Sequence, residues 1–276
     1  MAESTTNPGR RRRLPSSGRL LVAQVGYQLR LLLRTPRALG AGVAVPALLL
    51  VLSNPKGGDL PASHLAGLAV LGVTVTAWVT HGIGLVAARE AGVLKRWRAA
   101  PLPPWCWFAG RISATVLVAT LAAGVTVGIG VARYGTRLDA GTAVGLLVAV
   151  GLGALAWATP ATALSGVIPS VEGASPILTL TYLPVILLSG VFGSPIGQPH
   201  WLTTLASYLP AQPMIDAATR ALEHPAGPPV LPGHDLVVIA GWAVAGLVAS
   251  LVLFRWEPSR PAGRSPVRRR LQAAAS

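Results

Sequence analysis

The sequence contains a single cysteine, Cys106, so it cannot form an internal disulfide framework. Charged residues make up only 12% of its 276 residues, and nine of them are acidic. The nine acids form no cluster, which argues against metal-dependent hydrolysis and paired-carboxylate catalysis. The CxxC, HExxH, GxSxG and GxxxxGK[ST] patterns are also absent, which excludes the corresponding zinc, hydrolase and nucleotide sites.

Apolar residues, in contrast, are abundant: they make up 52% of the chain, and the mean hydropathy is +0.57. A bilayer is crossed by about 20 apolar residues in a helix, so the chain has room for about six such helices. We therefore predict an all-α integral membrane protein with six transmembrane helices. The expected spans are approximately 38–53, 64–88, 112–132, 140–168, 176–192 and 236–254.

Basic residues determine the expected orientation. Nineteen of the 23 Lys and Arg residues fall on one side of the six-span arrangement, which predicts that both termini are cytosolic. Residues 1–16 and 257–276 are expected to be basic cytosolic tails, the first of them disordered, around a membrane domain at 17–256. The net charge of +14 lies beside apolar runs, so it favours a membrane surface and not a nucleic acid as partner. The arginine-rich composition is typical of bacteria with GC-rich genomes, and we expect the bacterial inner (plasma) membrane.

A basic segment at 17–37 precedes the first span. Its arginines share one helical face, while leucines and valines occupy much of the rest, which predicts an amphipathic helix in the inner membrane interface. The alternative is a simple extension of the first transmembrane helix. The arginines on the shared face are Arg19, Arg30, Arg34 and Arg37.

Two further features inside the membrane domain leave alternatives open. Segment 193–222 is neutral, moderately apolar and broken by prolines, which fits either a re-entrant helical segment or a surface loop. His81 is the one imidazole clearly inside a span, and it could pack helices by hydrogen bonding or act as a proton relay. The spans carry no Asp, Glu, Lys or Arg away from their predicted ends, which argues against ion-coupled transport.

Segment 88–104 is the best candidate for contact with a cytosolic partner. It combines a charged face with an apolar face, and amphipathic helices dock in grooves of partner proteins. The alternative is a short connector whose charges only set the topology. The charged face consists of Arg89, Glu90, Lys95, Arg96 and Arg98, and the apolar face of Val93, Leu94 and Trp97.

The order of these segments carries a resemblance to a known family. A basic interfacial helix and two spans are followed by "AREAGVLKRWRAAPLPPW", four more spans follow, and "SYLPAQPMIDAATRAL" precedes the last. Over about residues 20–256 the chain resembles type-2 ABC transporter permeases, particularly bacterial drug-export subunits of the daunorubicin-resistance kind. The motif positions that carry the resemblance are Glu90, Gly92 and Leu94, with Pro101, Leu102 and Pro103 in the turn that follows.

The resemblance implies roles for two cytosolic segments. Residues 89–98 would form the coupling helix that contacts a separate ATPase, and the turn at 169–175, with Glu172, would be a smaller second contact. Lys95 or Arg96 stands where the family usually has an acidic residue. The complex would contain two ATPase copies and a second permease subunit, identical or different. ATP and Mg would bind to the ATPase, and this chain, itself no enzyme, would bind no cofactor.

The resemblance also implies export of a lipophilic or amphipathic compound, such as a drug, natural product or lipid, by a protein surrounded by membrane lipids. A polysaccharide or glycolipid exporter would share the fold. A non-transport membrane anchor or assembly protein is the alternative from another class. An enzyme acting on isoprenoid lipids is a third reading, which the missing acidic motif makes remote.

Overall fold

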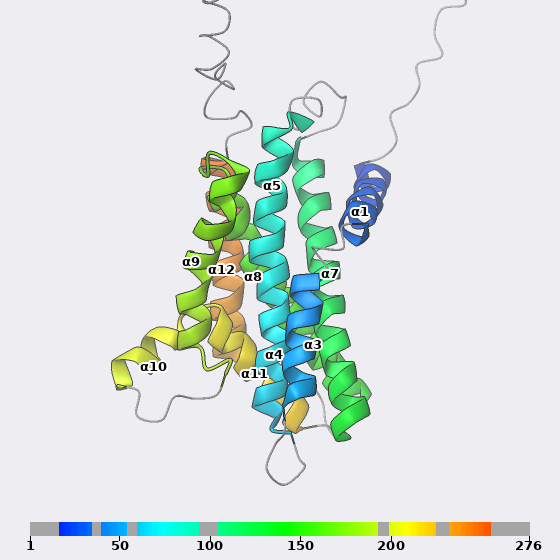
Figure 1. Ribbon diagram of the computed structural model, residues 1–276, viewed down its shortest axis with the longest axis vertical. Coiled ribbons are helices and arrows are strands. Elements are labelled where there is room, and N and C mark those ends of the chain that lie inside the picture. Colours follow the sequence, from blue (N-terminus) through cyan, green and yellow to red (C-terminus); the bar gives the residue numbers. More distant parts are fainter. Residues whose placement is uncertain are drawn as a thin grey trace, which may run out of the picture.

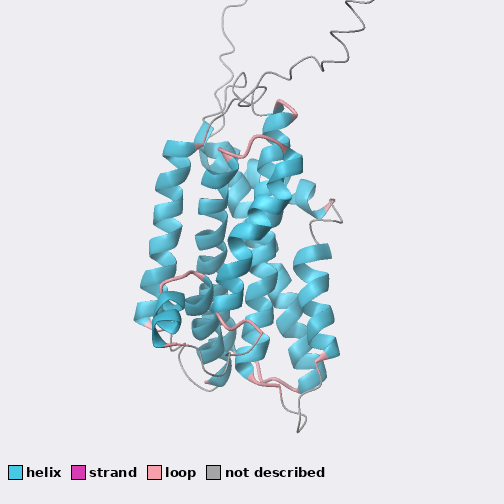
Figure 2. Ribbon diagram, turned by 60° about the vertical axis from the view of Figure 1, so that its left-hand side comes forward, coloured by secondary structure: helices cyan, strands magenta, loops and turns pink. Residues whose placement is uncertain are grey.

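The computed structural model describes residues 17–34, 40–53, 60–93, 104–192, 199–224 and 232–254. Within these ranges the regular elements are helices, and they form an upright bundle (Figure 1 and Figure 2). Five helical stretches are long and apolar enough to cross a membrane, and a sixth apolar stretch, Gly40–Leu52, is shorter. The predicted all-α membrane architecture is therefore confirmed. The five stretches are Ala62–Glu90, Trp105–Tyr134, Ala140–Ser165, Val171–Leu188 and Gly233–Leu253.

The helices follow the expected order of spans. The first span consists of η1 (Gly40–Ala44) and α3 (Val45–Leu52), and the second of α4 (Ala62–Thr74), η2 (Val75–Thr80) and α5 (His81–Glu90). The remaining spans are α7 (Pro104–Tyr134), α8 (Ala140–Ser165), α9 (Val171–Leu188) and α12 (Gly233–Leu253). Outside the spans lie α1 (Ser17–Leu33), α10 (His200–Ser207) and α11 (Ala211–Glu223).

Two spans begin earlier than the apolar runs suggested. Helix α7 starts at Pro104, a residue type suited to the first turn of a helix, so Arg111 lies inside the helix and not at its border. Helix α9 starts at Val171 because Ser170 caps it, with its Oγ accepting a hydrogen bond from the N–H of Gly173 at 3.4 Å. The absence of charge marks where a span is apolar, whereas helix ends depend on capping.

The central core depends on small residues at helix crossings. Helices α8 and α12 approach so closely that a Cβ at Gly246 would lie 2.4 Å from the Pro160 ring. Ser250 Oγ donates to the carbonyl of Thr159 at 2.8 Å, and Thr159 Oγ1 donates to that of Ala243 at 2.9 Å. Hydroxyl-to-backbone bonds of this kind replace the hydrophobic effect, which does not drive association of helices within lipid.

Helix α1 packs along α7. Its buried side chains recur every four residues and are Gln24, Gln28 and Leu32, of which Leu32 contacts Ala114 and Val118. Arg19 and Arg30 are exposed on α1, and Arg34 is exposed directly after its last residue, as the predicted arginine face requires. Arg37 lies outside the described residues. The helix position with respect to a membrane surface stays a prediction.

The segment between the fifth and sixth spans contains two short helices, α10 and α11. Helix α11 is buried along one face against α4, α8 and α12, and Met214 fits against Gly153 of α8. Both neighbouring spans, α9 and α12, meet this segment at the same end of the bundle (Figure 1). A segment that begins and ends at the same end of the bundle agrees with the predicted re-entrant alternative. How deeply this segment enters a bilayer stays a prediction.

Candidate functional site at the end of the second span

Arg89, in the last turn of α5, binds the end of α8. Only 2% of the residue is exposed. Its Nη1 donates to the carbonyls of Ser165 at 3.0 Å and Gly166 at 2.7 Å, and Nη2 donates to that of Ile168. The last carbonyls of a helix lack intrahelical partners and carry the negative end of the helix dipole, so a buried guanidinium is well placed there. Arg89 thereby anchors α5 to α8.

Glu90, the next residue, binds the start of α9. Its Oε2 accepts a hydrogen bond from the backbone N–H of Val171 at 3.1 Å, while the side chain stays exposed. A carboxylate at a helix N-terminus interacts favourably with free N–H groups and with the helix dipole. The adjacent Arg89 and Glu90 therefore hold both ends of the short connection between α8 and α9.

The α8–α9 connection was the predicted second contact with an ATPase. Its residue Glu172 is exposed in the first turn of α9, one residue after the N–H that Glu90 binds. The structure thus brings Glu90 and Glu172 together at one end of the bundle. It places Arg89 under that surface, as an internal anchor with almost no area for a partner to contact.

Gly92 ends α5 and turns the chain away from it. Its φ is +69°, a left-handed conformation that side-chain-bearing residues rarely adopt, and its N–H donates to the carbonyl of Arg89 at 3.1 Å. The glycine of the sequence motif is thus explained by backbone geometry. The other predicted coupling and turn residues lie outside the described residues: Leu94, Lys95, Arg96, Trp97, Arg98, Pro101, Leu102 and Pro103.

His81 joins three spans at the start of α5. The residue is fully buried, and its Nδ1 and Nε2 lie 2.7 Å from Thr115 Oγ1 on α7 and 2.9 Å from Thr162 Oγ1 on α8. Both hydroxyls also bond to carbonyls one turn earlier in their own helices. Each ring nitrogen thus faces a threonine hydroxyl, an arrangement that fits helix packing by hydrogen bonding.

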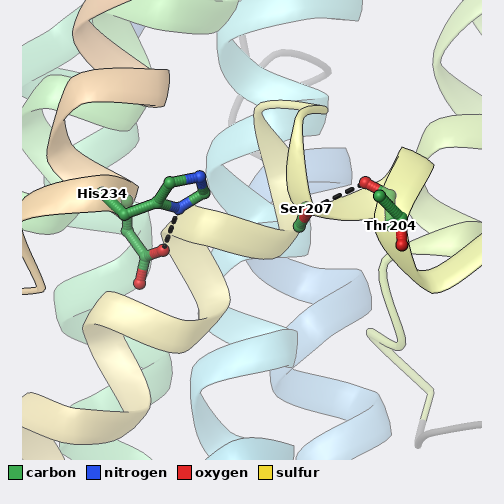
Figure 3. A network of polar contacts seen from close by, with 4 residues as sticks. Thr204, Ser207 and His234 are labelled. Atoms are coloured by element: carbon green, nitrogen blue, oxygen red, sulfur yellow. Dashed lines mark hydrogen bonds and ion pairs between the residues drawn. The ribbon is translucent and has the colours of Figure 1, made fainter.

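A second polar group lies at the opposite end of the bundle. His234 Nδ1 and Asp235 Oδ1 of α12 lie 3.2 Å apart, and the His234 ring lies 5.9 Å, between ring centroids, from that of Tyr208 at the end of α10. In a separate contact on α10, Ser207 Oγ donates to the carbonyl of Thr204 (Figure 3). Burial, and secondarily the nearby Asp235 carboxylate, raise the pKa of Asp216 on α11. Asp235 is also buried, so acids occur near the start of the last span where the sequence predicted only an outer boundary.

The comparison with known families matches this architecture. The model of the family described as ABC-2 type transporter matches residues 23–222, from α1 through α11. The chain belongs to the ABC-2 type transporter family. No individual curated protein matches it. As an ABC-2 membrane domain, it is a multi-pass permease and a transport component rather than the ATPase. ABC-2 permeases generally pair with an ABC ATPase, and the partner binds the ATP.

Proposed function

We propose that this ABC-2 permease exports lipophilic or amphipathic compounds and is driven by a separate ATPase through segment 88–104. The observation that supports this proposal is the attachment of the second span to the α8–α9 connection by Arg89 and Glu90. By the family resemblance, residues 89–98 and the turn at 169–175 both contact the ATPase. The bonds of Arg89 and Glu90 attach these two segments to each other. A force applied to either segment reaches α5, α8 and α9 together.

Arg89 and Glu90 have different roles in this proposal because one side chain is buried and the other is exposed. Glu90 and Glu172 are exposed and offer carboxylates to a basic surface of the ATPase, whereas Arg89 is covered and carries motion inward. Nucleotide-driven closure of two ATPase copies would press on both segments. His81 extends the connection further into the bundle, because it ties α5 to α7 and α8 about two helical turns before Arg89.

The remaining partners in this proposal are a second permease subunit and the lipids of a bacterial inner membrane, with both termini cytosolic. Gly124 and Gly128 of α7 are exposed, and nothing lies within 4 Å of a Cβ at either position, so a second permease helix could approach there. ATP and Mg belong to the ATPase. The apolar, small-residue composition of the spans favours a lipophilic substrate, of which a drug of the daunorubicin kind is one example.

The test is transport by the permease reconstituted with the ATPase that co-purifies with it. Leu94→Asp places a charge on the predicted apolar knob, and truncating such a knob typically costs about 1–3 kcal/mol of binding. Glu90→Gln weakens the attachment to Val171. We expect both variants to reduce substrate-stimulated ATP hydrolysis and transport, with Leu94→Asp the stronger.

Glu223→Gln is the matched control, because it neutralises an exposed carboxylate at the opposite end of the bundle and should leave coupling unchanged. If Leu94→Asp and Glu90→Gln transport as well as the wild type, segment 88–104 is only a connector. Transport of hydrophilic glycans but not lipophilic compounds would reject the proposed substrate class.

A further inference from the structure

Arg111 of α7 is a buried cation that the proposed function does not use. Only 8% of the residue is exposed, and its Nη1 donates a hydrogen bond to Gln28 Oε1 of α1 at 3.1 Å. Its Nε has no hydrogen-bond partner, and no carboxylate of the described ranges pairs with it. A buried charge without a counter-charge is strongly unfavourable, so this position calls for an anion.

Two neighbouring side chains also have a buried hydrogen-bond donor without a partner. The Nε2 of Gln24 and the Nε1 of Trp107 are also buried without hydrogen-bond partners. Trp107 lies one helical turn before Arg111, and Gln24 lies one turn before Gln28, against Gly110. All three unpartnered atoms donate hydrogen bonds and none of them accepts. A ligand that satisfies all three atoms would therefore carry several acceptor oxygens.

We infer that Arg111, Gln24 and Trp107 hold the phosphate of an anionic phospholipid in the seam between α1 and α7. Phosphate provides the negative charge and the multiple acceptor oxygens that an arginine fork and two N–H donors require. Arg111 lies about 10 Å along α7 from Pro104, within reach of the headgroup level for a long side chain. An indole N–H in this zone is typical of membrane interfaces.

The surroundings favour a lipid over a free anion. Val22 of α1 and Trp105 of α7 are 73% and 52% exposed on the two helices that form the seam, and acyl chains around these helices would cover such apolar side chains. Arg19 and Arg30 on the exposed face of α1 would attract the same class of lipid. Helix α1 packs mainly on α7 and lies at the edge of the bundle, so the seam between the two helices is next to the surrounding lipid (Figure 1).

The space at the seam is shaped by glycine. A Cβ at Gly84 of α5 would lie 2.1 Å from Nη2 of Arg111, and one at Gly110 would lie 2.5 Å from Cγ of Gln24. Both glycines therefore let the polar side chains lie flat against the helix backbones. The site combines α1, α5 and α7, and it is separate from the attachment of Arg89 and Glu90 to the α8–α9 connection.

The experiment measures lipid binding to the full-length chain in detergent by native mass spectrometry. The probes are phosphatidylglycerol and phosphatidylcholine with identical acyl chains, and inorganic phosphate alone. We expect the wild type to prefer phosphatidylglycerol. Arg111→Gln should weaken that binding about tenfold and Trp107→Phe about threefold, since each removes one donor, charged or neutral. Arg133→Gln, a charge-matched change at the far end of α7, should not alter it.

Trp107→Phe keeps an aromatic ring against Leu85 and Phe108 and removes only the indole N–H. This variant therefore tests the lipid site if Arg111→Gln does not fold. Equal binding of the two lipids by the wild type would overturn the inference. An undiminished preference for phosphatidylglycerol in Trp107→Phe and Arg111→Gln would also overturn it. Binding of inorganic phosphate at the same concentrations, lost in Arg111→Gln, would reject the lipid in favour of a free anion.

Discussion

Glu90 accepts a hydrogen bond at 3.1 Å from the backbone N–H of Val171, which lies 81 residues further along the chain. Its neighbour Arg89 donates to the carbonyls that precede that N–H, at the end of α8. Two consecutive residues of opposite charge thus satisfy a helix C-terminus and a helix N-terminus. This arrangement joins α5, α8 and α9 into one unit at the end of the bundle where the ATPase is proposed to bind.

The attachment predicts a large effect of removing Arg89. Arg89→Gln should lower the free energy of unfolding by about 3 kcal/mol, because a charged donor to several buried carbonyls is lost. Arg133→Gln removes an exposed arginine and should change it by less than about 0.5 kcal/mol. Denaturant unfolding in detergent micelles provides the measurement. Equal stability of the two variants would show that the Arg89 bonds contribute little.

The left-handed conformation at Gly92 predicts that adding a side chain at this position is unfavourable. Gly92→Ala should destabilise the chain by about 1 kcal/mol or redirect the residues that follow, because φ is +69° there. Gly151→Ala is the control, since that glycine lies within α8 with open space around it and should gain up to about 1 kcal/mol. Unfolding midpoints of both variants check the opposite signs. A stabilising Gly92→Ala change would contradict this account of the turn.

The crossing of α8 and α12 predicts a steric effect at Gly246. A Cβ there would lie 2.4 Å from Cδ and 2.5 Å from N of Pro160, neither of which can move aside easily. Gly246→Ala should therefore destabilise the bundle by about 1–3 kcal/mol. Gly241→Ala on the same helix meets nothing within 4 Å and should be neutral or slightly stabilising. Comparable stability of the two variants would mean that the helices separate without cost.

The raised pKa of Asp216 predicts a pH dependence of stability. Burial, first, and the Asp235 carboxylate, second, favour the protonated acid, while Arg220 and Gln212 oppose them. The folded state then binds more protons than the unfolded state, so stability should rise as pH falls through the folded pKa towards the ordinary aspartate value. Asp216→Asn should flatten this dependence, whereas Glu223→Gln should retain it. Unfolding measured between pH 7 and pH 4 tests the sign.

Some features of the chain follow from its sequence because they depend on local chemistry. The long apolar runs determine an all-helical membrane fold, since backbone groups in lipid must be paired within the segment. The ABC-2 membership was also visible, in the charged motif after the second span and in the order of segments. The subfamily, the substrate and the interfacial position of α1 stay predictions.

Other features depend on contacts between distant segments, and only the tertiary structure decided them. Arg89 and Glu90 look in the sequence like the charged residues that follow them, yet Arg89 is buried against α8 and Glu90 binds α9. Arg111 marked a span boundary in the sequence and became the buried centre of a polar seam with α1. A charge in a sequence shows only that it needs a partner, and whether that partner is water, lipid or a helix end depends on how the helices pack.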